Sequence, residues 1–152
     1  MTAQAPRRDF DADLAIMFAT ARSEWLDAFS RLEIAVLKCS ERRGLAPAAR
    51  GTPLRQRIAE LRSIKASPDC ARAIVDKLGK VTGSIEKLLP LRATIVHSAL
   101  LTGKRDGTPV ALFQNVLDAA SGTPTYLVTT LEDLDRGRKQ LAELTASLDS
   151  IP

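Results

Sequence analysis

Apolar residues recur at helical spacing through residues 10–43, a stretch that contains neither proline nor glycine. Steps of three and four residues place them on one side of a helix. This stripe consists of Leu14, Phe18, Ala21, Trp25, Ala28, Leu32, Val36 and Cys39. The pattern predicts one long amphipathic helix ended by Gly44, because glycine is the usual residue just beyond a helix C-terminus.

Two proline-containing segments predict the starts of a second and a third helix. Thr52-Pro53 precedes a short apolar stripe, and Ser67-Pro68 precedes a longer one that runs to Ala99. Threonine and serine suit the N-cap, and proline suits the first helical position. The longer stripe keeps helical phase across Pro90, so we expect a kink near residues 86–90.

The periodicity changes after His97 and becomes helical again near Thr130. Two apolar runs flank Asp106-Gly107, a strong turn signal, and predict a short β-hairpin or a long loop. Gly122-Thr123-Pro124 marks a further break, and Asp133 is placed to complete a capping box with Thr130. We therefore expect an all-α antiparallel bundle of four main helices, with the hairpin or loop inserted before the last one. A single domain would span residues 10–152 after a flexible segment 1–9.

Composition narrows the class of protein. The chain has 152 residues, 45% hydrophobic and 26% charged, which is typical of a globular domain. We expect no membrane association, because no apolar run approaches the roughly 20 residues that span a bilayer. The first residues lack a signal peptide's apolar core, so we expect a cytoplasmic protein. With one histidine in the chain, Cys39 and Cys70 predict buried thiols and no metal site, and we expect no cofactor.

The net charge of +4 is unevenly distributed. Basic residues are concentrated between residues 42 and 65, and four of them are candidates for contact with RNA phosphates: Arg55, Arg57, Arg62 and Lys65. Such a cluster suits phosphate, but a solvated helix face has the same composition.

Arg92 falls at the centre of the third helix's apolar stripe, where a bundle core normally takes an aliphatic residue. Arginine keeps its charge, and burying it unpaired is costly. Glu33 on the first helix lies among Phe29, Val36 and Leu37, its neighbours one turn either side, and not on a polar face, so we expect it to pair with Arg92 at or near the core. The pair would either fix helix register or serve a catalytic site.

His97 is the chain's one histidine and follows Arg92 by five residues, about 140° around an ideal helix. An arginine and a histidine at this spacing, late on a bundle helix and before a hairpin, resemble the motif of the HEPN superfamily (higher eukaryotes and prokaryotes nucleotide-binding). The segment Ile95-Val96-His97-Ser98 is similar to that family's motif helix. The first helix, with Trp25, Leu32-Glu33 and Val36-Leu37, resembles its opening helix.

The resemblance implies a metal-independent endoribonuclease of a toxin or defence system, acting as a homodimer, with RNA as substrate and an antitoxin or other protein as partner. His97 would act as acid or base, Arg92 would stabilise the charged phosphate, and Glu33 would orient Arg92. Ala93 stands where many active members have a polar residue, and Ala99 where some have tyrosine. The alternative is a non-catalytic interaction module in which Arg92 and Glu33 are structural.

Overall fold

The computed structural model describes residues 11–49, 51–115 and 126–152. The predicted flexible segment 1–9 and the predicted break at Gly122-Thr123-Pro124 lie outside these residues. The described elements are α1 (Ala12–Arg42), α2 (Leu54–Arg62), α3 (Arg72–His97), β1 (Ser98–Arg105), β2 (Thr108–Asn115), β3 (Tyr126–Thr129) and α5 (Leu131–Asp149).

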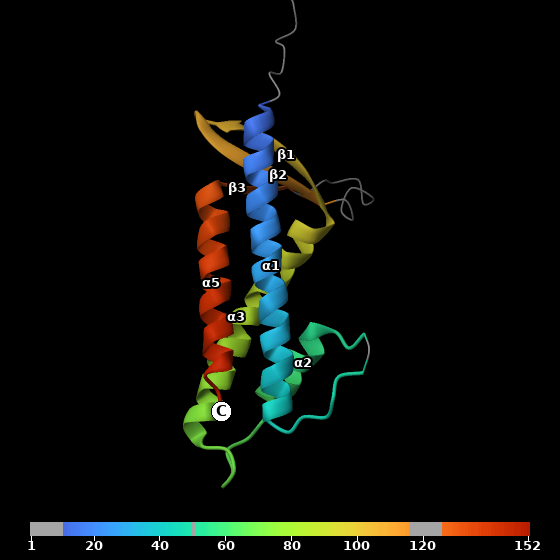
Figure 1. Cartoon of the computed structure of the whole chain (residues 1–152), viewed down its shortest axis with the longest axis vertical. Helices are drawn as coiled ribbons and strands as arrows, with labels where there is room; N and C mark the ends of the chain where they lie inside the picture. The colour runs from blue at the N-terminus through green and yellow to red at the C-terminus, as the bar shows by residue number, and fades with distance from the viewer. Residues whose placement is uncertain (1–10, 50, 116–125) are drawn as a thin grey trace, which may run out of the picture.

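The three strands form one antiparallel sheet in the order β1-β2-β3, at the end of the molecule where α3 ends and α5 begins (Figure 1). The fold is therefore mixed α and β, and the all-α prediction is wrong. The predicted hairpin is present, but it also pairs with β3, because Leu112 lies opposite both Leu101 and Val128. β3 has four residues, and a strand this short is stable only when it pairs with a neighbouring strand such as β2.

The helices also depart from the predicted antiparallel arrangement. α1 and α5 run in the same direction and lie side by side, while α3 runs opposite to both (Figure 1). The C-termini of α1 and α5 therefore meet at one end. There Arg42 of α1 donates from Nε to the carbonyl oxygen of Ile151 at 3.0 Å and from Nη2 to that of Leu148 at 2.9 Å. A cation suits this position because both helix dipoles end there with negative partial charge.

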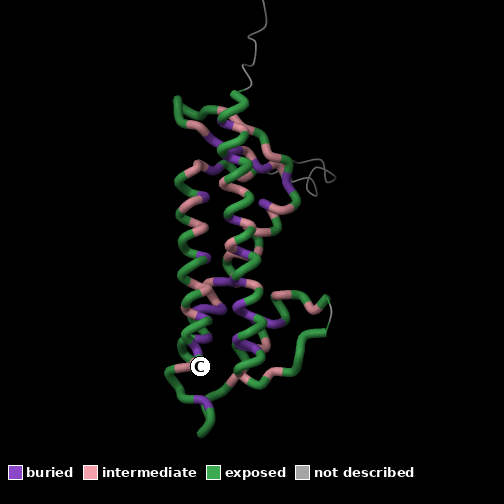
Figure 2. The backbone as a smooth tube through the Cα atoms, in the orientation of Figure 1, coloured by how far each residue is buried: buried purple, intermediate pink, exposed green. Residues whose placement is uncertain are grey.

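The core lies between the facing sides of α1, α3 and α5 and continues under the sheet (Figure 2). Trp25 and Phe29 stack in α1 with ring centroids 5.5 Å apart, and both are almost fully buried. Phe113 and Ala111 present the buried face of β2 to this core. Each large side chain buried in this way contributes about 1.5–3 kcal/mol of transfer free energy.

Several local signals act as predicted. Thr130 and Asp133 form the capping box of α5, and Asp106 and Gly107 turn the hairpin with φ of 51° and 79°. Two positive φ values in succession are typical of the type I′ turn, whose twist suits a hairpin. Cys39 and Cys70 are free and buried, and burial raises the pKa of the Cys39 thiol.

The two predicted proline starts are wrong in detail. Pro53 is itself the N-cap of α2, while the Thr52 hydroxyl bonds to the carbonyl oxygen of Ala49. Ser67 and Cys70 exchange two backbone hydrogen bonds of 3.0 Å, so Pro68 belongs to a tight turn, and α3 begins only at Arg72. Proline suits the second position of such a turn as well as it suits a first helical turn.

α3 continues through Pro90, which lies on an exposed side of the helix. Proline has no N–H, so the carbonyl oxygen four residues earlier in the helix loses its usual hydrogen bond. Because this side of the helix faces solvent, water can bond to that oxygen instead. No helix in the described part of the chain is long and apolar enough to cross a membrane.

Candidate functional site

The predicted ion pair between α1 and α3 is present. Arg92 Nη2 lies 3.3 Å from Glu33 Oε1, and the guanidinium carbon of Arg92 lies 5.6 Å from the ring centroid of Phe29. The side chains of Arg92 and Glu33 are 39% and 32% exposed, so the pair lies at the edge of the core and not within it. Both charges keep contact with water, which removes most of the cost expected for a buried pair.

This exposure leaves Arg92 with free hydrogen-bonding capacity. A guanidinium has five N–H donors in a planar fork, and the contact with Glu33 involves one nitrogen. The remaining donors can meet a second anion at the surface without breaking the pair.

His97 is the last residue of α3, and its side chain is exposed. Arg92 faces α1 through Glu33 and Phe29, whereas His97 lies about 140° further around an ideal helix. Within one chain, the structure therefore joins Arg92 to Glu33 and leaves His97 on another side of the helix.

The end of the motif segment is held by a residue that the sequence analysis missed. Arg22 Nη2 donates to the carbonyl oxygens of Ile95 at 2.7 Å and Val96 at 3.2 Å, and its guanidinium carbon lies 5.7 Å from the ring centroid of Phe113. These carbonyls are among those left without a helical partner at a C-terminus. Arg22 therefore fixes the turn of α3 that carries His97.

A signal for Arg22 was available. Like Glu33, it lies on the flank of the first helix's apolar stripe, one turn from Phe18 and Trp25. A charged residue among apolar neighbours predicts a partner on an adjoining element, for Arg22 as for Glu33.

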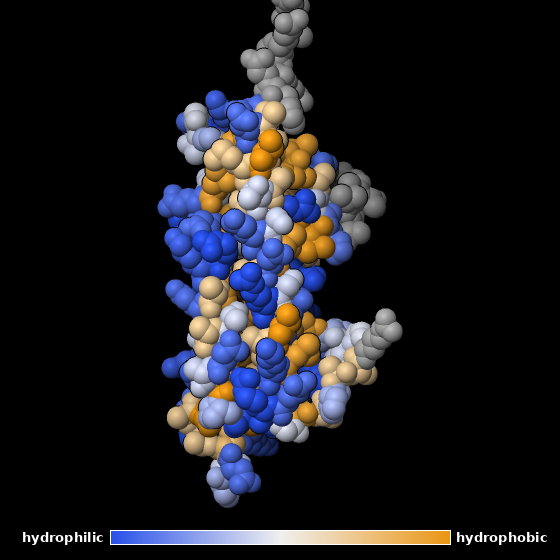
Figure 3. All heavy atoms as spheres, in the orientation of Figure 1, coloured by the Kyte–Doolittle hydropathy of each residue, from blue (hydrophilic) through white to orange (hydrophobic). Residues whose placement is uncertain are grey.

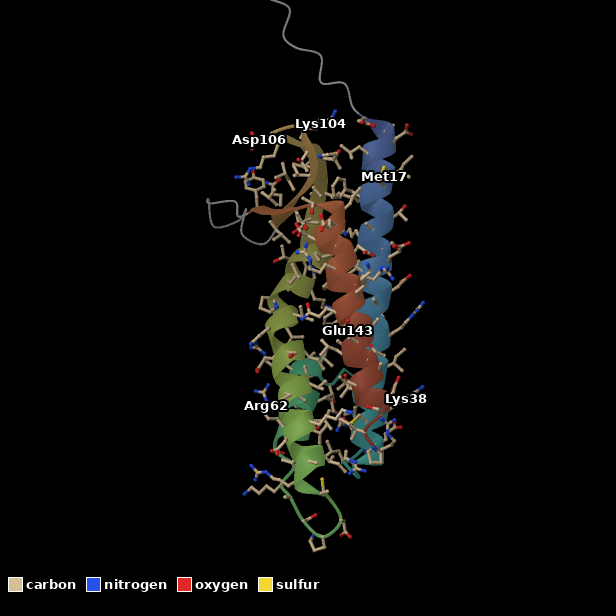
Figure 4. The ribbon with its side chains drawn as sticks, turned by 90° about the vertical axis from the view of Figure 1, so that its left-hand side faces the viewer. Met17, Lys38, Arg62, Lys104, Asp106 and Glu143 are labelled. Carbon is tan, nitrogen blue, oxygen red and sulfur yellow. The ribbon has the colours of Figure 1, made fainter. Side chains whose placement is uncertain are left out.

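The four predicted RNA-binding residues differ in accessibility. Arg57 is only 4% exposed, because it donates at 2.7 Å to both Glu60 Oε2 and the carbonyl oxygen of Ala46, so it fastens the loop before α2 and cannot meet RNA. Arg62 is half exposed and pairs with Glu86 at 2.8 Å. Arg55 and Lys65 are exposed. In Figure 4, Arg62 points away from the side of the molecule that carries Met17 and Lys38.

No cluster of three or more histidine, cysteine or carboxylate side chains is arranged to hold a metal ion in the described residues. Comparisons with models of known protein families, with curated proteins and with solved structures find nothing that matches this chain.

Proposed function

We propose that the protein is a HEPN-like RNA-cleaving or RNA-binding protein that acts as a cytoplasmic homodimer. The observation that carries the proposal is the exposure of two chemically suitable groups on α3, the imidazole of His97 and the outer part of the Arg92 guanidinium. Histidine titrates near neutral pH, and arginine makes bidentate contacts with phosphate.

The reaction would be metal-independent attack of an RNA 2′-hydroxyl on its own phosphorus. A base takes the proton of the 2′-hydroxyl, the P–O5′ bond breaks, and an acid protonates the leaving 5′ oxygen, which leaves a 2′,3′-cyclic phosphate and a 5′-hydroxyl. A cation stabilises the charge that develops on the phosphate oxygens. Arg92 is suited to this last role, and Glu33 holds its side chain in place.

A second proton-transfer group is needed, and the chain has one histidine. A two-fold dimer that brings two copies of His97 together supplies both acid and base. The proposal therefore requires dimerisation. An antitoxin or another protein would be a further partner. Arg55 and Lys65, which are exposed, and half-exposed Arg62 would contact the RNA backbone.

The experiment is incubation of the purified protein with mixed RNAs in the presence of EDTA. We expect products with 2′,3′-cyclic phosphate ends, lost in His97→Ala and strongly reduced in Arg92→Ala. Arg138→Ala is the matched control, because Arg138 is likewise half exposed and paired with a carboxylate, that of Asp135, and it has no part in the proposed RNA contact. Absence of cleavage, or equal cleavage by wild type and His97→Ala, refutes the enzymatic proposal.

The second candidate is a non-catalytic interaction module. It is favoured by the apolar side chains that α1 exposes, because Ile16 is 63% and Met17 52% exposed, with Ile34 and Leu37 further along the helix. Orange groups interrupt the hydrophilic surface on the face shown in Figure 3. An interaction module would bind its partner equally well with His97→Ala and less well with Met17→Ser, which distinguishes it from the ribonuclease.

A further inference from the structure

A pocket of about 260 Å³ is lined by residues of α1, α3, β3 and the beginning of α5. Its walls are largely apolar, and they include Trp25, Leu91, Ile95, Leu127, Leu134 and Gly137. An apolar cavity of roughly 150 Å³ is enough to hold benzene, so this volume suits a molecule of roughly eight to twelve heavy atoms.

One polar group of this wall has no hydrogen-bond partner among the described residues. The indole N–H of Trp25 donates no hydrogen bond to any described residue, although the residue is only 1% exposed. A buried indole N–H ordinarily finds an acceptor, because leaving it unpaired costs free energy. Trp25 and Gly137 both line the pocket, and Nε1 is the atom of the indole that lies nearest to the Cβ position of Gly137.

Gly137 lets the indole of Trp25 lie against α5. A Cβ on Gly137 would lie 2.7 Å from Nε1 of Trp25, closer than real side-chain contacts allow. Any larger residue at this position of α5 would displace the indole. The glycine costs the helix roughly 1 kcal/mol relative to alanine, and the close approach of the indole accounts for its presence.

The charge at the pocket excludes anions. Asp133 lines it and stays ionised, because hydrogen bonds with Thr130 and the charge of Arg136 lower the pKa of its carboxyl group. No lysine or arginine belongs to the described wall. The chemistry of the pocket thus calls for an uncharged, mostly apolar molecule with a hydrogen-bond acceptor.

We propose that this pocket binds a small neutral molecule, aromatic or aliphatic, whose single carbonyl or hydroxyl oxygen accepts the indole N–H of Trp25. The site is independent of the ribonuclease proposal. Its ligand would be a hydrophobic metabolite of the size of an aryl ketone or a benzylic alcohol.

The test uses the single tryptophan of the chain, whose indole N–H gives one signal in a 15N–1H NMR spectrum. Acetophenone and benzyl alcohol serve as probes, and ethylbenzene serves as a control of similar shape without an acceptor. We expect both probes to shift the indole signal and to bind at least about fivefold more tightly than ethylbenzene, the usual effect of one hydrogen bond.

Two variants sharpen the comparison. Trp25→Phe keeps an aromatic ring but removes the donor, so calorimetry should show equal affinity for probes and control. Gly137→Ala should abolish binding of both probes, while Gly103→Ala, with no atom near its added methyl group, should leave it unchanged. If either variant fails to fold, the wild-type comparison still decides. The proposal is overturned if neither probe moves the indole signal, or if ethylbenzene binds as tightly as the probes.

Discussion

The ion pair between Arg92 and Glu33 gives the most direct quantitative test of the structure. Arg92→Met removes the charge but keeps most of the side chain's apolar stem, and Glu33→Gln removes the opposite charge. Ion pairs as exposed as this one contribute about 0.2–1 kcal/mol, because water screens the attraction. The contact of Arg92 with Phe29 adds about 0.5–1 kcal/mol at a partly exposed site.

We therefore expect Arg92→Met to lower the free energy of unfolding by about 0.7–2 kcal/mol. The coupling energy from a double-mutant cycle with Glu33→Gln should stay below about 1 kcal/mol. Breaking a pair buried in the core would instead cost about 3–5 kcal/mol. The two cases are well separated.

The assay is urea unfolding followed by circular dichroism, on the wild type, both single variants and the double variant. Arg62 and Glu86 provide a matched cycle, because their side chains are each 42% exposed and 2.8 Å apart between neighbouring helices. Both cycles should give coupling of similar size. A coupling above about 3 kcal/mol for Arg92 and Glu33 alone would contradict the exposed position of the pair.

Three further predictions concern single residues. Arg22→Met should lower the free energy of unfolding by about 2 kcal/mol, because two charged hydrogen bonds to the end of α3 are lost. Amide exchange in the last turn of α3 should also become faster. A loss under about 0.5 kcal/mol would show that water replaces these hydrogen bonds. Asp133→Ala should cost about 1 kcal/mol at pH 7. Because the folded state lowers the pKa of Asp133, this difference should be fully present above the unfolded pKa of about 3.9 and be lost as the pH falls from there through the lower folded pKa. A constant difference in an unfolding series down to about pH 2 would refute this assignment. Gly107→Ala should lower the free energy of unfolding by about 1 kcal/mol, measured by heat or urea, because the φ of Gly107 is 79°. Gly103→Ala should lower it by less, and equal losses for the two variants would refute the assignment of the turn.

Signals within a few residues were sufficient to predict several local elements, although not the fold class. The apolar stripe of α1, the capping box of α5 and the Asp106-Gly107 turn each depend on neighbours in sequence, and each is confirmed. β3 and the parallel course of α1 and α5 depend on distant partners. A run of four residues such as Tyr126–Thr129 carries too little periodicity to be assigned as a strand until β2 is placed beside it.

The candidate site shows the same division. Arg92 interrupts the apolar stripe of α3 and Glu33 lies among apolar neighbours on α1, and these two unusual positions correctly predict their contact. Their depth was overestimated, because a stripe gives the direction of a side chain and not its distance from water. Arg57 shows the reverse error, since it belongs to a basic run but is buried by a backbone carbonyl of the preceding loop. The pattern of charges along the sequence does not predict a hydrogen bond of this kind.

The side-by-side course of α1 and α5 has a consequence for how the chain folds. The helices that enclose Trp25 and Phe29 are separated in sequence by α2, α3 and the whole sheet, so their packing has high contact order. The hairpin and the individual helices can form early from local interactions. Most of the apolar side of α1 nevertheless stays uncovered until α5 packs against it. This late step should limit the folding rate, and a chain in which α1 is still uncovered should be the form most prone to aggregate.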